Sequence, residues 1–261
     1  MKIRTGSLAE MKRQGKRFAC LTSYDQQTAE IYDQAGIEVL LVGDSASNTV
    51  LANDGTVAIT LDEMIPFGRA VARIAKSALV VLDMPFGSYE ESAEQALRNG
   101  IRAMKESGVA ALKLEGPRIE QVKTLVDNGI PVMGHVGFTP QSVHGLSGFK
   151  VQGRADDADR ILNEALALEQ AGAFAIVLEM VPATLGALIT EKLSIPTIGI
   201  GAGSKTDGQI LVWTDFAGLG GRSPSFSKQY ANLREILGSA ATKYAAEVRS
   251  GVFPPADKDF S

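Results

Sequence analysis

Five side chains that can bind a metal or titrate occupy equivalent places in this chain, because each ends a short apolar run. They are Asp44, Asp83, Glu115, His135 and Glu179. The run Ala78–Leu82 is wholly apolar, for example, and Asp83 follows it directly. A charged carboxylate is almost never fully buried unless it is paired or bound to a metal. One such residue is more often a loop or cap residue, but five at matching places indicate a shared site.

The carboxylates among these residues predict a metal centre. Asp44, Asp83 and Glu115 would repel one another in a partly dry site unless a cation lay among them. An all-oxygen set suits a hard divalent ion, and we expect Mg²⁺, which keeps open positions for water and substrate. Lys113 lies two residues before Glu115, so on a strand both side chains point the same way, and the lysine can bind a substrate carboxylate.

Two further residues complete the predicted chemistry. Glu179 lies on a separate strand beyond the metal cluster and is free to act as a base. For His135 we expect a structural or substrate-positioning role, with metal ligation as the alternative. His144, in the glycine-rich "HGLSGFKVQG", is expected to be a surface or lid residue. For "GIGAGS" a tight turn is favoured over a phosphate cradle of backbone N–H groups.

The elements that must position these residues repeat along the chain. The segments "QAGIEVLLVGDS", "ESGVAALKLEG", "DNGIPVMGHVG" and "QAGAFAIVLEM" each pass from a helix end, through a glycine, into a buried strand. Further strands are predicted in "ACLTSYD", before Asp83, in "SIPTIGIGAGS" and in "QILVWT". Helices lie between them, and one of these opens on a capping-box pair, Thr60 and Glu63.

About eight alternating β and α elements indicate an α/β fold with a parallel sheet covered by helices. We predict a (β/α)8 TIM barrel, with a doubly wound open sheet as the alternative. The chain is expected to form a single domain over residues 1–261, with accessory helices at both ends. The barrel core should span about residues 18–222, and a C-terminal helix and tail residues 223–261. Because the carboxyl ends of barrel strands meet on the active face, the five strand-end residues should converge.

Composition narrows the class of function. The net charge of −4 provides no basic field for nucleic acid or a membrane surface. The densest basic cluster, Lys12 to Arg17, is interpreted as a solvated helix end. No apolar run is of membrane-spanning or signal-peptide type, so a cytoplasmic protein acting on small molecules is expected. Cys20 has no internal disulfide partner and is expected to be buried and inert.

Several motifs also resemble one known family. They are "LTSYD", "LLVGDSA", "TLDEMI", "DMPFGSYE", "LKLEG", "PVMGHVGFTPQS", "QAGAFAIVLEMVP" and "SIPTIGIGAGSKTDGQILV". In this order, over most of the chain, they closely resemble the ketopantoate hydroxymethyltransferase family. The resemblance implies a (β/α)8 barrel, Mg²⁺, 5,10-methylenetetrahydrofolate as one-carbon donor, and a homodecamer built as a dimer of pentamers. It also implies the reaction, transfer of a hydroxymethyl group to 3-methyl-2-oxobutanoate through a metal-stabilised enolate, giving 2-dehydropantoate for pantothenate and coenzyme A synthesis.

The resemblance also assigns roles to residues. Asp44, Asp83 and Glu115 match the family's metal-binding carboxylates, and Glu179 matches its proton acceptor. Asp44, Ser45, Asp83 and Lys113 match its 2-oxo acid contacts, to which we add His135. Departures from the family pattern occur after Ser45, in "IPFGRAV", at Thr206 and in "GRSPSFSKQY", but none at a metal or base position.

Two other functions remain open at this point. One is a Mg²⁺-dependent lyase or mutase resembling the isocitrate lyase and phosphoenolpyruvate mutase group. Such enzymes typically carry a cysteine on a catalytic loop, whereas the only cysteine here is Cys20, inside the first predicted strand. The other is a barrel that only binds a ligand or partner, which should have lost a metal carboxylate or the base.

Overall fold

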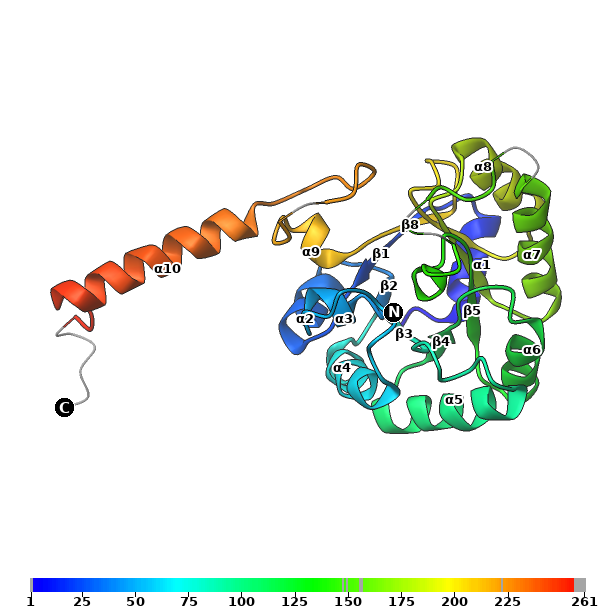
Figure 1. Cartoon of the computed structure of the whole chain (residues 1–261), viewed down its shortest axis with the longest axis horizontal. Coiled ribbons are helices and arrows are strands. Elements are labelled where there is room, and N and C mark those ends of the chain that lie inside the picture. Colours follow the sequence, from blue (N-terminus) through cyan, green and yellow to red (C-terminus); the bar gives the residue numbers. More distant parts are fainter. Residues whose placement is uncertain (1, 147, 149, 155–156, 222, 256–261) are drawn as a thin grey trace. The chain divides into compact units, whose positions relative to one another are not determined.

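Eight parallel strands form a closed barrel in the order of the sequence (Figure 1). The computed structural model describes residues 2–146, 148, 150–154, 157–221 and 223–255. The strands are β1 (Phe18–Thr22), β2 (Val39–Val42), β3 (Leu79–Asp83), β4 (Ala111–Lys113), β5 (Val132–Gly137), β6 (Ala175–Glu179), β7 (Thr197–Ile200) and β8 (Gly208–Leu211). Pairing of β1 with β8 closes the ring. The predicted TIM barrel is therefore confirmed, and the open sheet is wrong.

Helices alternate with the strands and surround them in Figure 1. They are α2 (Gln26–Gln34), α3 (Ala46–Thr49), α4 (Leu61–Ile74), α5 (Ala93–Ser107), α6 (Ile119–Asp127), the 3₁₀ helix η1 (Pro140–Ser142), α7 (Ala158–Gln170) and α8 (Ala183–Lys192). The predicted capping box opens α4, where Thr60 Oγ1 accepts from Glu63 N and the Glu63 carboxylate accepts from Thr60 N. The glycines predicted to end helices have left-handed φ angles, such as 79° at Gly108 and 97° at Gly172.

An N-terminal helix, α1 (Thr5–Arg13), packs against the barrel core. Its Leu8 is fully buried and shares one apolar cluster with strand residues such as Val39, Val81 and Val177. Lys12 Nζ, on the same helix, lies 2.9 Å from Asp207 Oδ2, just before β8. The prediction that the whole basic cluster is solvated is wrong for Lys12, whose aliphatic stem follows the buried face of α1 and whose ammonium finds a carboxylate.

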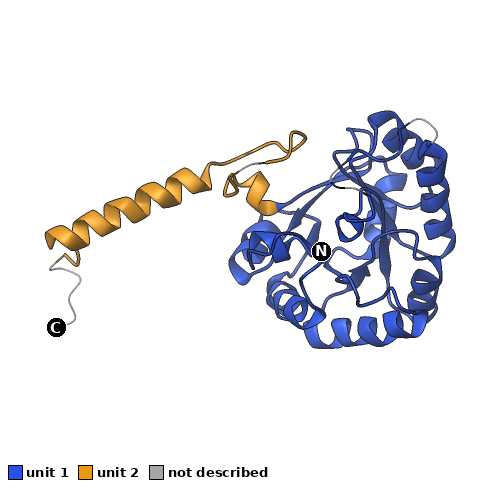
Figure 2. Cartoon of the chain, viewed as in Figure 1, with its two compact units in different colours: residues 1–212 blue, residues 213–261 orange. Residues whose placement is uncertain are grey.

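The C-terminal part of the chain forms a second compact unit. Residues 1–212 make up the first unit and residues 213–261 the second (Figure 2). The second contains α9 (Trp213–Phe216) and α10 (Leu233–Ser250), the predicted C-terminal helix. Trp213 and Thr214, which were expected to end the last strand, instead begin α9. None of the described helices is both long enough and apolar enough to cross a bilayer.

Candidate active site

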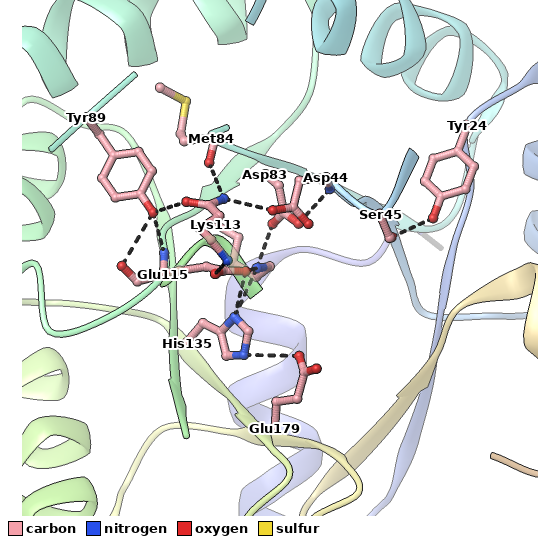
Figure 3. Close-up of polar contacts among 11 residues, drawn as sticks. Tyr24, Asp44, Ser45, Asp83, Met84, Tyr89, Lys113, Glu115, His135 and Glu179 are labelled. Atoms are coloured by element: carbon pink, nitrogen blue, oxygen red, sulfur yellow. Dashed lines mark hydrogen bonds and ion pairs between the residues drawn. The ribbon is translucent and has the colours of Figure 1, made fainter. Parts of the chain in front are cut away.

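The strand-end residues singled out by the sequence come together inside the first unit (Figure 3). Asp83 and Glu179 end β3 and β6, and Asp44 and Glu115 follow β2 and β4 by two residues. His135 lies within β5. Parallel pairing sets β3 beside β4, so that Asp83 aligns with Lys113. The convergence expected at the carboxyl ends of the strands is therefore present.

Lys113 lies at the centre of this cluster. Its Nζ is 2.9 Å from Asp83 Oδ1, 3.6 Å from Glu115 Oε1 and 3.3 Å from His135 Nδ1. Only 3% of Lys113 is exposed. Burial alone would lower the pKa of its ammonium, but the neighbouring carboxylates outweigh burial and raise that pKa above its usual value. Lys113 is therefore a buried, permanently charged cation.

Asp44 and Asp83 are neighbours with like charge. Asp83 Oδ2 accepts the backbone N–H of Asp44 at 3.0 Å, and both residues are buried. Burial, together with the charges of Glu115 and Asp83, raises the pKa of Asp44 well above its usual value. Burial also raises the pKa of Asp83, although Lys113 opposes this effect. Ionising Asp44 is therefore unfavourable unless another cation approaches.

His135 links the carboxylate cluster to the predicted base. Its Nδ1 lies 3.3 Å from Glu115 Oε1, and its Nε2 lies 3.3 Å from Glu179 Oε2. Burial and Lys113 lower the pKa of His135, but the two glutamates outweigh them and raise it to about 9. Burial raises the pKa of Glu115, but Lys113 and His135 overcome it and hold that pKa at about 2. His135 thus belongs to the site as a charged partner of both glutamates.

The backbone around Glu179 is tightly held. Phe138 N donates to Glu179 O at 2.8 Å, and Met180 N donates to Ile200 O at 2.9 Å. Met180 has a left-handed φ of 48°, which is uncommon for a residue with a side chain. Gly137, aligned with Glu179 across β5 and β6, has a φ of 97°. A Cβ at Gly137 would collide with Glu179 O, so the glycine permits the close approach of β5 to the backbone of Glu179.

Ser45 and three residues that the sequence did not single out complete the cluster. Ser45 Oγ lies 2.7 Å from Tyr24 Oη, beside Asp44. Gln141 Nε2 donates to Asp44 Oδ2 at 2.9 Å, and Tyr89 Oη donates to Gln141 Oε1 at 2.5 Å. All three stand in segments that resemble the family. Tyr24 follows β1 by two residues, as Asp44 follows β2, but Tyr89 and Gln141 lie further along the chain after β3 and β5, where the repeat gives no signal.

The donor set fits a hard divalent cation. When ionised, the four carboxylates of the cluster carry four negative charges; they belong to Asp44, Asp83, Glu115 and Glu179. Lys113 and protonated His135 carry one positive charge each, so the described cluster has a net charge of −2, which a divalent cation would neutralise. Asp83 Oδ1 is fully buried and meets Lys113 without a well-directed hydrogen bond. Within the part of the chain that the structure describes, no three acidic, His or Cys side chains already surround one common point. The metal ligands assigned to Asp44, Asp83 and Glu115 stay a prediction.

Other predicted features lie apart from the cluster. His144 is exposed on the loop after η1. In "GIGAGS", Gly201 and Gly203 have left-handed φ angles of 63° and 82°, and Gln209 Nε2 donates to Gly203 O at 2.9 Å, so the segment is a tight turn. Cys20 is buried in β1, and burial raises the pKa of its thiol well above the usual value. It cannot serve as a reactive loop cysteine.

Solved structures of similar shape share only the fold. A phosphonopyruvate hydrolase superposes with a TM-score of 0.63 at 13% identity, covering 99% of this chain and 92% of that one. A 2,3-dimethylmalate lyase of the phosphoenolpyruvate mutase and isocitrate lyase superfamily superposes with a TM-score of 0.61 at 16% identity, covering 100% and 93%. At these identities the likeness gives no support to lyase or mutase activity.

Sequence comparison identifies the family. A relative from Leifsonia xyli subsp. xyli (strain CTCB07), a 3-methyl-2-oxobutanoate hydroxymethyltransferase, is 56% identical over 99% of this chain and 95% of its own length. A relative of the same name from Acidothermus cellulolyticus (strain ATCC 43068 / DSM 8971 / 11B) is 58% identical over 94% and 92%. The family model for ketopantoate hydroxymethyltransferase matches residues 2–256. The chain is therefore a one-carbon transferase and belongs to the ketopantoate hydroxymethyltransferase family.

Proposed function

We propose that this protein transfers a hydroxymethyl group from 5,10-methylenetetrahydrofolate to 3-methyl-2-oxobutanoate, giving 2-dehydropantoate for pantothenate and coenzyme A synthesis. Membership of the family supports the reaction. The observation that carries the mechanism is the contact between His135 and Glu179, because it sets a carboxylate beside Lys113 and the predicted metal ligands, which with a bound cation would hold a negatively charged 2-oxo acid. Lys113 supplies the fixed positive charge for the substrate carboxylate.

Each residue has a distinct task in this proposal. Glu179 accepts the proton from C3 of the 2-oxo acid, and His135 orients the Glu179 carboxylate through Nε2. Lys113 and Ser45 orient the substrate, together with His135, Asp44 and Asp83. Mg²⁺, held by Asp44, Asp83 and Glu115, would stabilise the negative charge that develops on the keto oxygen.

The overall reaction balances with water as the third reactant. The electron pair left at C3 forms the new C–C bond to the folate methylene carbon. The bonds from that carbon to the two folate nitrogens break, and the oxygen of water becomes the new hydroxyl group. The products are tetrahydrofolate and 2-dehydropantoate. The lyase and mutase alternative is weaker, because Cys20 is buried in β1 and the family is that of a transferase.

The proposal includes a homo-oligomer that works in the cytoplasm. We propose a homodecamer of 27.6-kDa chains, arranged as a dimer of pentamers. Light scattering coupled to gel filtration measures the mass directly, and a monomer or dimer at micromolar concentration would contradict the assembly without touching the chemistry.

An assay of hydroxymethyl transfer tests the function. Purified protein is incubated with 3-methyl-2-oxobutanoate and 5,10-methylenetetrahydrofolate, with Mg²⁺ or with EDTA, and 2-dehydropantoate is measured. We expect product only when folate, 2-oxo acid and metal are all present. Product formed equally well in EDTA would contradict the metal, and no product under any condition would contradict the reaction.

A further inference from the structure

Gln141 is a buried amide that joins two carboxylates of the site from outside the strands. It lies in η1, after β5, and only 5% of it is exposed. Its Nε2 donates to Asp44 Oδ2 at 2.9 Å and to Met84 O at 3.0 Å. Its backbone N–H donates to Glu115 Oε2 at 3.0 Å. A single residue therefore contacts the carboxylates that follow β2 and β4, on either side of β3.

The contacts leave only one orientation for the Gln141 amide. Nε2 faces two acceptors, the Asp44 carboxylate and Met84 O, and Oε1 faces the hydroxyl of Tyr89. Turning the amide over would direct Oε1 at those two acceptors and remove both hydrogen bonds. The hydrogen-bond donors and acceptors around the Gln141 amide therefore fix its orientation.

Tyr89 holds the other end of the amide. Only 1% of Tyr89 is exposed, and its hydroxyl lies 2.5 Å from Gln141 Oε1 but 3.4 Å from Glu115 O. The single hydroxyl proton therefore goes to Gln141, while the Tyr89 oxygen accepts the backbone N–H of Glu115 at 3.2 Å. The chain of contacts runs from Glu115 through Tyr89 and Gln141 to Asp44, and every buried polar atom named in it has a partner.

We propose that Gln141 is a positioning residue, which fixes the Asp44 and Glu115 carboxylates at the spacing needed to bind a divalent cation, with Tyr89 fixing the Gln141 amide. The inference rests on the proposed function for the identity of the ligand. Residues that orient metal ligands typically change metal affinity by about 10- to 100-fold when they are replaced. The role differs from simple packing, because packing alone would affect stability without a specific effect on metal affinity.

Direct measurement of metal binding tests the inference. Mn²⁺ binding, followed by electron paramagnetic resonance, is compared for the unchanged protein, for Gln141→Met, which keeps length and removes the amide, and for the control Gln209→Met. Gln209 also donates through its amide to a backbone carbonyl, but it lies in β8 and contacts none of these carboxylates. We expect Gln141→Met to weaken Mn²⁺ binding about 10- to 100-fold, and Gln209→Met to leave it unchanged.

A second variant keeps the test decisive if Gln141→Met fails to fold. Tyr89→Phe removes one hydroxyl and should weaken Mn²⁺ binding in the same direction, by a smaller factor. The double variant should lose less binding free energy for Mn²⁺ than the sum of the losses in the two single variants, because both substitutions act through one amide. Mn²⁺ affinity within twofold of the unchanged protein in whichever of the two variants folds would overturn the inference.

The outcomes also separate this inference from the proposed function. If the unchanged protein binds no Mn²⁺ at millimolar concentration, the inference and the predicted metal site are both wrong. If Mn²⁺ binds normally and depends on Gln141, but no 2-dehydropantoate forms, only the proposed reaction is wrong.

Discussion

Glu179 and Lys113 lie on opposite sides of His135, so their tasks can be separated by substitution. In the proposed mechanism, proton removal from C3 needs Glu179 but not the folate. In D₂O with Mg²⁺ and no folate, the C3 hydrogen of 3-methyl-2-oxobutanoate should exchange for deuterium. We predict that Glu179→Gln, which keeps the shape and removes the base, slows this exchange about 10²- to 10⁴-fold. Proton NMR measures the exchange, and equally fast exchange in the variant would move the base elsewhere, with His135 as the next candidate.

Replacing Lys113 should act on substrate binding. Lys113→Met keeps the aliphatic stem and removes the charge, so the KM for the 2-oxo acid should rise roughly 10- to 150-fold, equivalent to about 1.5–3 kcal/mol for a lost charge-assisted hydrogen bond. Lys123→Met is the matched control, because Lys123 is paired with Asp127 on the exposed surface of α6. Steady-state kinetics at saturating folate gives both values, and an unchanged KM would show that Lys113 serves only the internal charge balance.

At the residue scale, the sequence predicts side chains that end strands and misses those that come from loops. Asp83 and Glu179 can be found because each interrupts an apolar run at a fixed place in a repeat. Gln141 and Tyr89 cannot be found this way, since no periodicity fixes the path of the loops that carry them. The prediction that Lys12 is solvated is wrong because a sequence does not reveal that Asp207, 195 positions away, lies opposite its ammonium.

The pairing of β5 with β6 controls the placement of Glu179, the proposed base. We predict that Gly137→Ala lowers kcat by displacing Glu179, since the new Cβ meets Glu179 O and lies 2.8 Å from Val181 Cγ1. Gly129→Ala is the control. Its φ of 83° is also left-handed, but nothing lies within 4 Å of the added Cβ. Both variants should lose about 1 kcal/mol of stability from the left-handed backbone, and Gly137→Ala should lose about 1–3 kcal/mol more from the collision. Only Gly137→Ala should lower kcat in the protein that remains folded, as kinetics and urea unfolding would show.

Asp33, near the end of α2, binds the segment that leads into β3. The Asp33 carboxylate accepts the backbone N–H groups of Lys76, Ser77 and Ala78 at 2.9, 2.9 and 2.6 Å. Partial burial opposes ionisation, but these three donors outweigh it and hold the pKa of Asp33 below its usual value. A lowered pKa in the folded state means that the stabilisation is present at neutral pH and is lost as pH falls through the folded pKa.

Asp33→Asn should therefore destabilise the protein in a pH-dependent manner. We expect a loss of about 1–3 kcal/mol at pH 7. The difference from the unchanged protein should shrink as the pH falls below about 4, the usual aspartate value. Urea unfolding at pH 7 and pH 3 measures this. Asp127→Asn, which breaks only an exposed pair, should change stability little at either pH, and an equal loss for Asp33→Asn at both pH values would contradict the account.

The helices and strands themselves are largely predictable from the sequence, but the residues at which they begin and end are not. The repeat of helix, glycine and apolar run predicts four of the strands, and short apolar runs predict the other four, because both patterns reflect local steric and burial requirements. It misplaces the end of the last strand, since "VWT" has high strand propensity while Trp213 and Thr214 begin α9. Tertiary context outweighs propensity at such ends.

Over the whole molecule, the unbalanced charge in the barrel should link stability to metal. We predict that Mg²⁺ raises the thermal unfolding temperature, since a ligand at 100 times its Kd stabilises a protein by about 2.7 kcal/mol. Asp44→Asn should remove this response. In EDTA, the same variant should be at least as stable as the unchanged protein, because it relieves repulsion from Glu115 and Asp83. A full Mg²⁺ response in the variant, measured by calorimetry, would place the metal away from Asp44.

The joining of β1 to β8, and of Lys12 to Asp207, has a consequence for protein synthesis. The first strand made by the ribosome finds its last neighbour only after Leu211 has been added and has left the exit tunnel. At roughly 5–20 residues per second, about 10 to 40 seconds pass in which β1 has an open edge. Bare strand edges recruit other chains. A nascent chain of this protein is therefore most prone to aggregate before β8 emerges. A truncated mRNA that ends before the codons of β8 would yield an open sheet, which cannot close because the last strand is missing.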